Sequence, residues 1–204
     1  MLKGLYVITD EKLTPYDKIL SMVEKALIGG AKIVQLRDKN NKDEDIQDYA
    51  IQLKNLCKKY DAIFIINDRI DLAKKVDADG VHVGEEYDDI KDLRKYLPDK
   101  IIGVSCYGSI ERAKKMEEDG ADYVAFGSFF PSPTKPKPNL VQKEIIKEAK
   151  KTLKIPICAI GGINIENAKE LINLGADMIA VVSDIWKQEN ITKRALEYKK
   201  LFED

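Results

Sequence analysis

The sequence predicts an α/β protein folded as a TIM (β/α)8 barrel, and three observations support this prediction. Short runs of apolar and β-branched residues recur eight times along the 204 residues. The stretches between these runs have the periodicity of amphipathic helices. Related small residues precede every second run. Alternating strands and helices predict an α/β fold, and eight such units in about 200 residues are the smallest size of this barrel.

The predicted strands are nearly continuous in apolar character, which is typical of strands buried on both faces of a parallel sheet. A helix is expected after each strand. In residues 43–60, for example, Ile46, Ala50 and Leu53 follow helical spacing, and charged or amide side chains occupy the other face. The predicted strands cover residues 5–9, 32–36, 62–66, 80–83, 101–105, 123–127, 155–160 and 178–182.

A repeated motif favours a closed barrel over an open sheet. The segments GGAKIVQL, VDADGVHV, DGADYVAF and LGADMIAV each place small residues before an apolar strand, at the second, fourth, sixth and eighth strands. Small residues let a helix end and the chain turn tightly, so the repetition indicates a ring of like units. The alternative is a large open Rossmann-like sheet, but no GxGxxG motif follows the first strand.

Composition and charge restrict the class of protein. The chain is 44% hydrophobic and 34% charged with a net charge of −1, so no overall field attracts nucleic acid or an anionic membrane. No apolar run reaches about 18 residues, and the opening residues do not resemble a signal peptide. Three widely spaced cysteines without a CxxC motif argue against disulfides and zinc. We expect one domain over residues 1–204 in the cytoplasm, and a homo-oligomer is compatible with the sequence.

Functional residues are expected at the carboxyl ends of the strands, where barrels of this type carry their active sites. After the second strand, Gln35, Arg37 and Lys39 alternate and would share one face of an extended chain. A guanidinium and an ammonium that point the same way suit a polyanion such as pyrophosphate. The alternative is a solvated strand end with surface ion pairs.

Oxygen and nitrogen ligands follow the third and fourth strands. Asn67 and Asp68 can hold a hard cation such as Mg²⁺, although the same pair is typical of a helix N-cap. His82 is the only histidine, which excludes a site with several histidine ligands, and a lone histidine on a strand is more often structural. The acids that follow it, including Asp88 and Asp89, either supply a second metal ligand or begin a helix favourably.

Hydroxyl and lysine side chains follow the fifth and sixth strands. Ser105 can bond a phosphate or a metal-bound water, and no serine nucleophile is predicted because no acid–histidine relay can be assembled. After the sixth strand, Ser132, Thr134 and Lys135 lie among the four prolines of residues 128–138. Prolines lower the entropy that is lost when a loop is ordered. This segment is therefore either a stiffened anion clamp or a spacer.

A phosphate cup is expected after the last two strands, where this fold often binds phosphate. Gly161 and Gly162 expose backbone N–H groups, and Val182 and Ser183 begin the next helical segment. A Gly-Gly pair by itself can also serve a turn. Together the strand ends predict two anion sites, which two phosphorylated substrates or one bisphosphate would fill.

Several of these segments belong to longer motifs, among them LYVITD, GGAKIVQLRDK, INDRIDLA, ADGVHVG, FPSPTK and GADMIAVVS. In this order and spacing, from residue 4 to about residue 186, they resemble the thiamine phosphate synthases. The resemblance implies a Mg²⁺-dependent enzyme that joins 4-amino-5-hydroxymethyl-2-methylpyrimidine diphosphate to a thiazole phosphate and releases pyrophosphate. In this family the pyrimidine is thought to lose pyrophosphate first, and the thiazole nitrogen then captures the cation. Such chemistry requires neutralisation of the leaving group more than a strong base.

The resemblance also implies a role for each candidate residue. The pyrimidine diphosphate would be held by Gln35, Arg37, Lys39 and Asn67, with Ser105 near its diphosphate. Magnesium would bind Asp68, and the loop clamp would consist of Ser132, Thr134 and Lys135. The thiazole phosphate would be held by Gly162, Val182 and Ser183. The residues implied to act in catalysis are Arg37, Lys39, Ser105 and Lys135.

One position departs from the family pattern. The family has G-Q-E-D after the histidine strand, with the aspartate as second magnesium ligand, whereas this chain has GEEY with Tyr87 at that place. Tyrosine is a poor ligand at neutral pH, because its ordinary pKa is about 10. Asp88, one position further on, is the expected substitute, and Glu85 or Glu86 is the alternative.

Two other functions are weighed against the synthase. A thiazole tautomerase-like paralogue usually lacks the aspartate of the NDR motif and has a histidine in the loop after strand six, whereas this chain has Asp68 and Ser132. A non-catalytic binder of thiamine phosphates is favoured by GEEY and opposed by the intact QLRDK and PSPTK segments.

Overall fold

The computed structural model describes residues 1–132 and 139–203, and its centre is a closed barrel of parallel strands. Each strand pairs in parallel with the next one along the chain, and the last pairs with the first, with Val181 opposite Val7. The strands are β1 (Gly4–Ile8), β2 (Ile33–Leu36), β3 (Ile63–Asn67), β4 (Gly80–Val83), β5 (Ile101–Tyr107), β6 (Tyr123–Phe126), β7 (Ile157–Ala159) and β8 (Met178–Val181).

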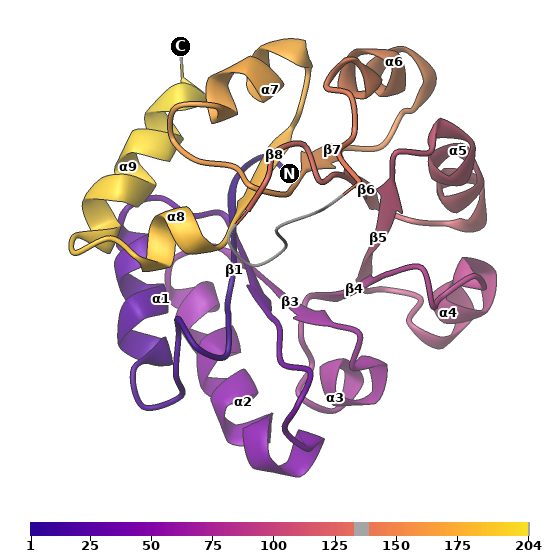
Figure 1. The fold of residues 1–204 in the computed structure, drawn as a ribbon. Helices are drawn as coiled ribbons and strands as arrows, with labels where there is room; N and C mark the ends of the chain where they lie inside the picture. The colour runs from indigo at the N-terminus through magenta and orange to yellow at the C-terminus, as the bar shows by residue number, and fades with distance from the viewer. Residues whose placement is uncertain (133–138, 204) are drawn as a thin grey trace.

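Helices follow the strands and form a ring around the barrel (Figure 1). A short extra helix, α8, lies between β8 and the last helix. The helices are α1 (Ile19–Ile28), α2 (Asp43–Lys59), α3 (Ile70–Lys75), α4 (Ile90–Tyr96), α5 (Ile110–Asp119), α6 (Glu144–Thr152), α7 (Ala168–Leu174), α8 (Ser183–Trp186) and α9 (Ile191–Leu201).

This architecture confirms the predicted TIM barrel, because the pairing of β8 with β1 excludes an open sheet. Every predicted strand overlaps an observed one, and the ends differ by at most two residues. The seventh strand begins only at Ile157, since Pro156 has no N–H with which to join the ladder. The fifth strand continues to Tyr107, and its register with β6 shifts between Ser105 and Tyr107.

The apolar character of the strands reflects two cores. Tyr6 and Ile8 belong to a cluster inside the barrel, whereas Leu5 and Val7 belong to the layer between the strands and the helices. Successive strand residues are therefore buried on opposite faces, which explains why the strands do not alternate between apolar and polar residues. The buried inner cluster consists of Tyr6, Ile8, Ile33, Ile65, Tyr123, Ala125, Cys158, Met178 and Ala180.

The aspartates of the repeated motif join neighbouring strands. In three of the four copies, the aspartate carboxylate accepts a hydrogen bond from a backbone N–H of the preceding strand. The second-strand copy has Lys32 instead of an aspartate. The pairs are Asp79 with Phe64 (2.7 Å), Asp122 with Ile102 (2.8 Å) and Asp177 with Ile157 (2.9 Å).

The cysteines agree with the prediction that the chain has no disulfide framework. Cys57, Cys106 and Cys158 are all buried and free. Burial raises the pKa of Cys57 and of Cys106 to about 12, so neither is a reactive thiolate at neutral pH. Within the described part of the chain, the helices are too short or too polar to cross a membrane.

Candidate active site

The carboxyl ends of β2 and β3 bring a cation, an amide and a carboxylate together. The Nζ atom of Lys39 lies 3.5 Å from the carboxylate of Asp68, and the Asn67 amide donates a hydrogen bond to the same carboxylate at 3.1 Å. The side chains of Lys39 and Asp68 are 52% and 41% exposed. A ligand at the mouth of the barrel can therefore reach both charges.

Asp68 turns the chain sharply from β3 into α3. Its φ of 60° lies in the left-handed region, which aspartate tolerates better than most residues. The Asp68 N–H donates to the carbonyl of His82 at 2.9 Å. The N-cap position of α3 is occupied by Arg69, without a side-chain capping bond. The helix N-cap alternative for Asn67 and Asp68 is therefore wrong.

Asp38 organises the loop after β2, although no sequence pattern points to it. Its side chain is fully buried and accepts hydrogen bonds from the Tyr16 hydroxyl (2.5 Å) and from the backbone N–H (2.9 Å) and amide (2.7 Å) of Asn41. The Arg69 guanidinium donates to the Asp38 carbonyl at 2.9 Å. Burial opposes ionisation of Asp38, but the hydrogen bonds from Tyr16 and Asn41 outweigh it and lower its pKa to about 2.

The extended chain expected from Gln35 to Lys39 is wrong beyond Leu36. β2 ends at Leu36 because the chain turns around the buried Asp38. Gln35 points into the barrel, where its amide donates to the Tyr6 hydroxyl at 2.8 Å. Lys39 instead approaches Asp68 from the loop, so its place in the site does not come from strand alternation.

His82 lies inside the barrel between a tyrosine and a serine. Its Nδ1 is 2.8 Å from the Tyr123 hydroxyl, and its Nε2 is 2.8 Å from Ser105 Oγ. Burial lowers the pKa of His82 to about 4, so the imidazole is neutral at physiological pH. Because a tyrosine rather than a carboxylate meets Nδ1, these contacts do not form an acid–histidine–serine relay.

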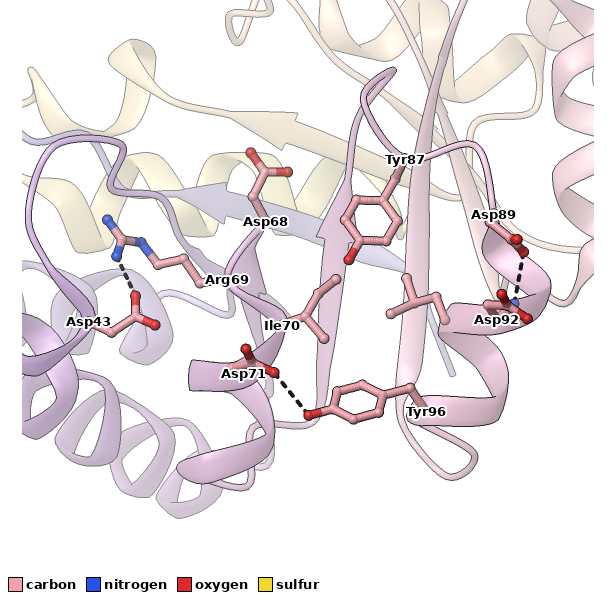
Figure 2. Close-up of a pocket in the computed structure, with 10 residues that line it drawn as sticks. Asp43, Asp68, Arg69, Ile70, Asp71, Tyr87, Asp89, Asp92 and Tyr96 are labelled. Carbon is pink, nitrogen blue, oxygen red and sulfur yellow. Dashed lines mark hydrogen bonds and ion pairs between the residues drawn. The ribbon is translucent and has the colours of Figure 1, made fainter.

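The loop after β4 brings Tyr87, not Asp88, to the pocket that Asp68 lines. Figure 2 shows Asp68 and Tyr87 along this pocket, which has a volume of about 480 Å³ and lies between the β3–α3 and β4–α4 connections. Asp88 is 87% exposed and pairs with Arg112 at 3.4 Å. Asp89 caps α4 by accepting a hydrogen bond from the backbone N–H of Asp92, so the helix-start alternative is confirmed for Asp89.

The predicted phosphate cup lies where the loops after β6, β7 and β8 meet. Gly162 has a φ of 65°, and an added Cβ would lie 2.4 Å from the Phe130 carbonyl oxygen, so only glycine lets the two loops approach this closely. Val182 holds the N-cap position of α8, and Ser183 is its first residue. Ser132 is half-buried, whereas Thr134 and Lys135 lie outside the described residues.

Asp184 stabilises this region, and no sequence pattern points to it either. Its carboxylate accepts hydrogen bonds from the Ile165 N–H in the β7–α7 loop (3.0 Å) and from Arg194 in α9 (2.7 Å). The Tyr198 hydroxyl of α9 donates to the same carboxylate. One half-buried carboxylate of α8 thus joins the β7–α7 loop to the last helix.

Comparison with known proteins identifies the family. Residues 5–185 match the family model described as thiamine monophosphate synthase. The chain belongs to this family. A thiamine-phosphate synthase of Wolinella succinogenes is 47% identical over 187 residues, which cover 91% of this chain and 86% of that protein. A thiamine-phosphate synthase of Nitrosococcus oceani is 43% identical over 202 residues, covering 98% of this chain and 93% of that protein.

A solved structure of the same family supports the fold independently. The thiamine phosphate pyrophosphorylase from Pyrococcus furiosus superposes with a TM-score of 0.90 at 39% sequence identity. The superposition covers 99% of this chain and 96% of that chain. The whole barrel, rather than a part of it, is therefore shared with this member of the thiamine monophosphate synthase family.

Within its described residues, this member of the thiamine monophosphate synthase family offers few oxygen ligands for a metal ion. Over residues 1–132 and 139–203, no group of three or more His, Cys, Asp or Glu side chains could hold a metal ion. Asp68 is partly exposed and presents one carboxylate at the mouth of the barrel. Mg²⁺ is usually bound through one or two carboxylates together with water and substrate phosphates. The donor set fits an ion that arrives with a diphosphate substrate, not one held by a protein cage.

Proposed function

We propose that this chain couples 4-amino-5-hydroxymethyl-2-methylpyrimidine diphosphate to hydroxyethylthiazole phosphate, giving thiamine phosphate and pyrophosphate. Family membership and the identity to named thiamine-phosphate synthases support the proposal. The structural observation that carries it is the cluster of Lys39, Asn67 and Asp68, which combines a cation with oxygen ligands at the mouth of the barrel.

The pyrimidine diphosphate would bind at the ends of β2, β3 and β5. Arg37 and Lys39 would pair with diphosphate oxygens, and the amides of Gln35 and Asn67 would contact the same substrate. Ser105 would donate to the diphosphate. The exposed ion pair of Lys39 stabilises the fold by at most about 1 kcal/mol, so a diphosphate can replace the carboxylate as the partner of this lysine.

The second substrate would bind at the phosphate cup. Backbone N–H groups of Gly162, Val182 and Ser183 would hold the thiazole phosphate, since amides at such loops are suited to anions. Ser132, Thr134 and Lys135 would also bind the diphosphate. The roles of Thr134 and Lys135 rest on the sequence motif.

Magnesium would bind Asp68 together with the diphosphate. When bound, Mg²⁺ would neutralise part of the diphosphate charge and so improve the leaving group. Asp88 would serve as second ligand only after leaving Arg112, with which it pairs at 3.4 Å. Tyr87 lines the same pocket as Asp68 but offers a phenol in place of a carboxylate.

The coupling would proceed by dissociation. The bond between the methylene carbon and the diphosphate oxygen breaks, and its electron pair leaves with pyrophosphate. The thiazole nitrogen then donates its lone pair to the carbon and forms the new C–N bond. Arg37, Lys39 and Lys135 would neutralise the leaving charge. No strong base is required, which agrees with a site whose histidine is buried and neutral.

The direct test is turnover by the purified chain with both substrates and Mg²⁺. We expect thiamine phosphate and pyrophosphate to form in equal amounts. Binding of thiamine phosphate without any turnover would refute the proposal in favour of a non-catalytic binder. Interconversion of thiazole tautomers without coupling would favour the tautomerase-like paralogue instead.

The loop clamp can be tested with a matched pair of lysines. Lys135→Ala should lower kcat about 100-fold, the size of effect seen when one charge-stabilising group is removed. Lys137→Ala, two residues away in the same proline-rich segment, should stay within about twofold of the unaltered chain. Equal rates for the two variants would contradict the clamp.

We also propose a cytoplasmic location, because free cysteines fit a reducing compartment. The substrates are small phosphorylated molecules, and one domain over residues 1–204 would suffice to bind both. Sedimentation of the full chain would establish whether it forms a homo-oligomer.

A further inference from the structure

Five side chains form a continuous hydrogen-bonded chain through the interior of the barrel. It begins at Gln35 on β2 and ends at Ser105 on β5. The bonds join Gln35 Nε2 to Tyr6 Oη (2.8 Å), Tyr6 Oη to Tyr123 Oη (2.7 Å), Tyr123 Oη to His82 Nδ1 (2.8 Å) and His82 Nε2 to Ser105 Oγ (2.8 Å). We call this series the interior chain.

The two tyrosines of the interior chain are shielded from water. Tyr6 and Tyr123 are 1% and 0% exposed. The ring of Tyr123 crosses β5 to reach His82, and Gly103 makes this possible, because an added Cβ there would lie 2.0 Å from the tyrosine ring. At these two tyrosines each hydroxyl hydrogen must therefore find its acceptor within the interior chain.

The first bond sets the direction of the others. The Gln35 amide nitrogen only donates, so the Tyr6 oxygen accepts. The Tyr6 hydroxyl has two partners among the described residues, and its own hydrogen therefore goes to Tyr123. Tyr123 in turn donates to His82 Nδ1. A neutral imidazole that accepts at Nδ1 carries its hydrogen on Nε2 and donates it to Ser105.

We propose that the interior chain holds His82 in its Nε2–H form and thereby turns the Ser105 hydroxyl hydrogen away from the histidine and toward the departing diphosphate. His82 and Tyr123 are then positioning residues that act through Ser105. This inference rests on the proposed coupling reaction, because it requires a diphosphate at the mouth of the barrel.

The direction of the chain matters because serine has a single hydroxyl hydrogen. If Ser105 had to donate to the histidine, its lone pairs would face the anion and repel it. With His82 as the donor, the hydroxyl hydrogen is available for a charge-assisted bond to a phosphate oxygen. A donor that is oriented before the reaction needs no reorganisation as charge develops on the leaving group.

The tautomer can be measured directly, since His82 is the only histidine in the chain. Nitrogen NMR of the ¹⁵N-histidine-labelled full chain at pH 7 should show a protonated Nε2 and an unprotonated Nδ1. Tyr123→Phe removes the donor at Nδ1 and should introduce the other tautomer. A protonated Nδ1 in the unaltered chain would overturn the proposal, because Ser105 would then donate to the histidine.

Kinetics test whether the tautomer matters for the reaction. Tyr123→Phe should lower kcat about tenfold, since it frees the orientation of one charge-stabilising donor, and should leave KM for the thiazole phosphate within about twofold. The matched control is Tyr60→Phe. The Tyr60 hydroxyl donates to Glu24, and its removal should change kcat by less than about twofold. Equal kcat values for the two variants would overturn the proposal.

A comparison of two substitutions separates positioning from packing. His82→Gln offers an amide nitrogen near the place of Nε2, so it should retain more activity than His82→Leu. When Ser105→Ala is also present, the His82→Gln and His82→Leu variants should be equally active, because the Ser105 hydroxyl through which His82 acts is gone. If His82→Gln remained more active than His82→Leu in the absence of the Ser105 hydroxyl, positioning through Ser105 would be refuted. A chain without coupling activity would refute the proposed function, whereas coupling together with an Nδ1–H histidine would refute only this inference.

Discussion

Asp38 illustrates how one buried carboxylate shapes the cationic part of the site. It accepts hydrogen bonds from Tyr16 in the β1–α1 connection and from Asn41 in the β2–α2 connection. Arg69, at the start of α3, donates to the Asp38 backbone and pairs with Asp43 of α2. The loop that carries Arg37 and Lys39 is thus tied to two helices, which restricts the positions these cations can take.

The depressed pKa of Asp38 makes a prediction about pH. The carboxylate has a pKa of about 2 in the folded chain and an ordinary value of about 3.9 when unfolded. Its stabilisation is therefore fully present above about pH 4 and is lost as the pH falls toward 2. Asp38→Asn should lower the free energy of unfolding by roughly 2 kcal/mol at pH 7.

Denaturant unfolding followed by circular dichroism at several pH values would check this. The difference between the unaltered chain and Asp38→Asn should shrink as the pH approaches 2. A difference that stays constant with pH would mean that the variant acts through packing and not through the charge of Asp38.

A substitution at Tyr87 should change the affinity of the site for Mg²⁺. Tyr87→Asp adds a carboxylate to the pocket that Asp68 already lines, so we expect half-maximal activity at about tenfold lower Mg²⁺. The measurement is the rate of pyrophosphate release as Mg²⁺ is titrated. Tyr96→Phe is the control, because Tyr96 lines the same pocket and its hydroxyl bonds Asp71.

The outcome for Asp88 distinguishes two sources of the second ligand. If Asp88 leaves Arg112 to bind the ion, then Asp88→Asn, made in the chain that keeps Tyr87, should need a higher Mg²⁺ concentration for half-maximal activity. No effect of either Tyr87→Asp or Asp88→Asn would contradict a second ligand from this loop.

Strand pairs, rather than single strands, are the units that the repeated motif stabilises. In three copies the aspartate before an even-numbered strand accepts a hydrogen bond from the strand before it. The carboxylate satisfies a backbone N–H at the strand's beginning that the sheet would otherwise leave to solvent. The repeat therefore has a structural cause beyond the small residues that allow the turn.

Asp177 is a suitable member of the repeat for a test. Asp177→Ala removes the acceptor of the Ile157 N–H and should lower the free energy of unfolding by about 1–2 kcal/mol. Asp177→Asn keeps an acceptor oxygen, so its free energy of unfolding should fall by less than half as much. Lys150→Met removes only the ion pair to Asp177 and should change stability by less than about 0.5 kcal/mol.

Denaturation midpoints of these three variants would be compared. A loss in Lys150→Met as large as that in Asp177→Ala would show that the ion pair, and not the bond to the strand, is the stabilising contact.

Closure of the barrel joins the two ends of the chain. β1 lies between β2 and β8, and the Trp186 indole in α8 donates to the carbonyl of Ile8 at 2.7 Å. Thr192 in α9 donates to the Lys25 carbonyl of α1 at 2.9 Å. The phosphate-cup side of the site therefore depends on contacts between segments more than 160 residues apart.

Trp186→Phe tests this closure. The variant keeps an aromatic ring but leaves the Ile8 carbonyl without its indole donor, so we expect a loss of about 1–2 kcal/mol of stability. We also expect KM for the thiazole phosphate to rise, since the proposed phosphate cup includes Ser183 of α8. Circular dichroism is the required probe, because Trp186 is the only tryptophan. Unchanged stability would show that the β1–β8 ladder alone closes the barrel.

Much of the fold follows from local pattern, whereas the site follows from it only in part. Apolar runs place the strands because burial on two faces demands apolar residues at successive positions. The cluster of Lys39, Asn67 and Asp68 follows from the rule that strand ends converge. Asp38 and Asp184 are missed, because nothing in the sequence next to a charged residue shows which distant N–H and hydroxyl groups will bond to it. Tyr6 and Tyr123 lie in apolar runs, so the sequence predicts core residues there and not members of a hydrogen-bonded chain.

Periodicity and chain order are enough to predict that eight strands and their helices close into a barrel, and to predict which residues follow each strand. The partners of those residues depend instead on how distant segments fold together. Tyr6 and Tyr123 are 117 positions apart, and they meet because strand pairing and inward orientation bring both into one interior. Likewise, Asp88 faces Arg112 while Tyr87 faces the pocket, since the path of the loop sets these directions, and no spacing along the chain encodes that path.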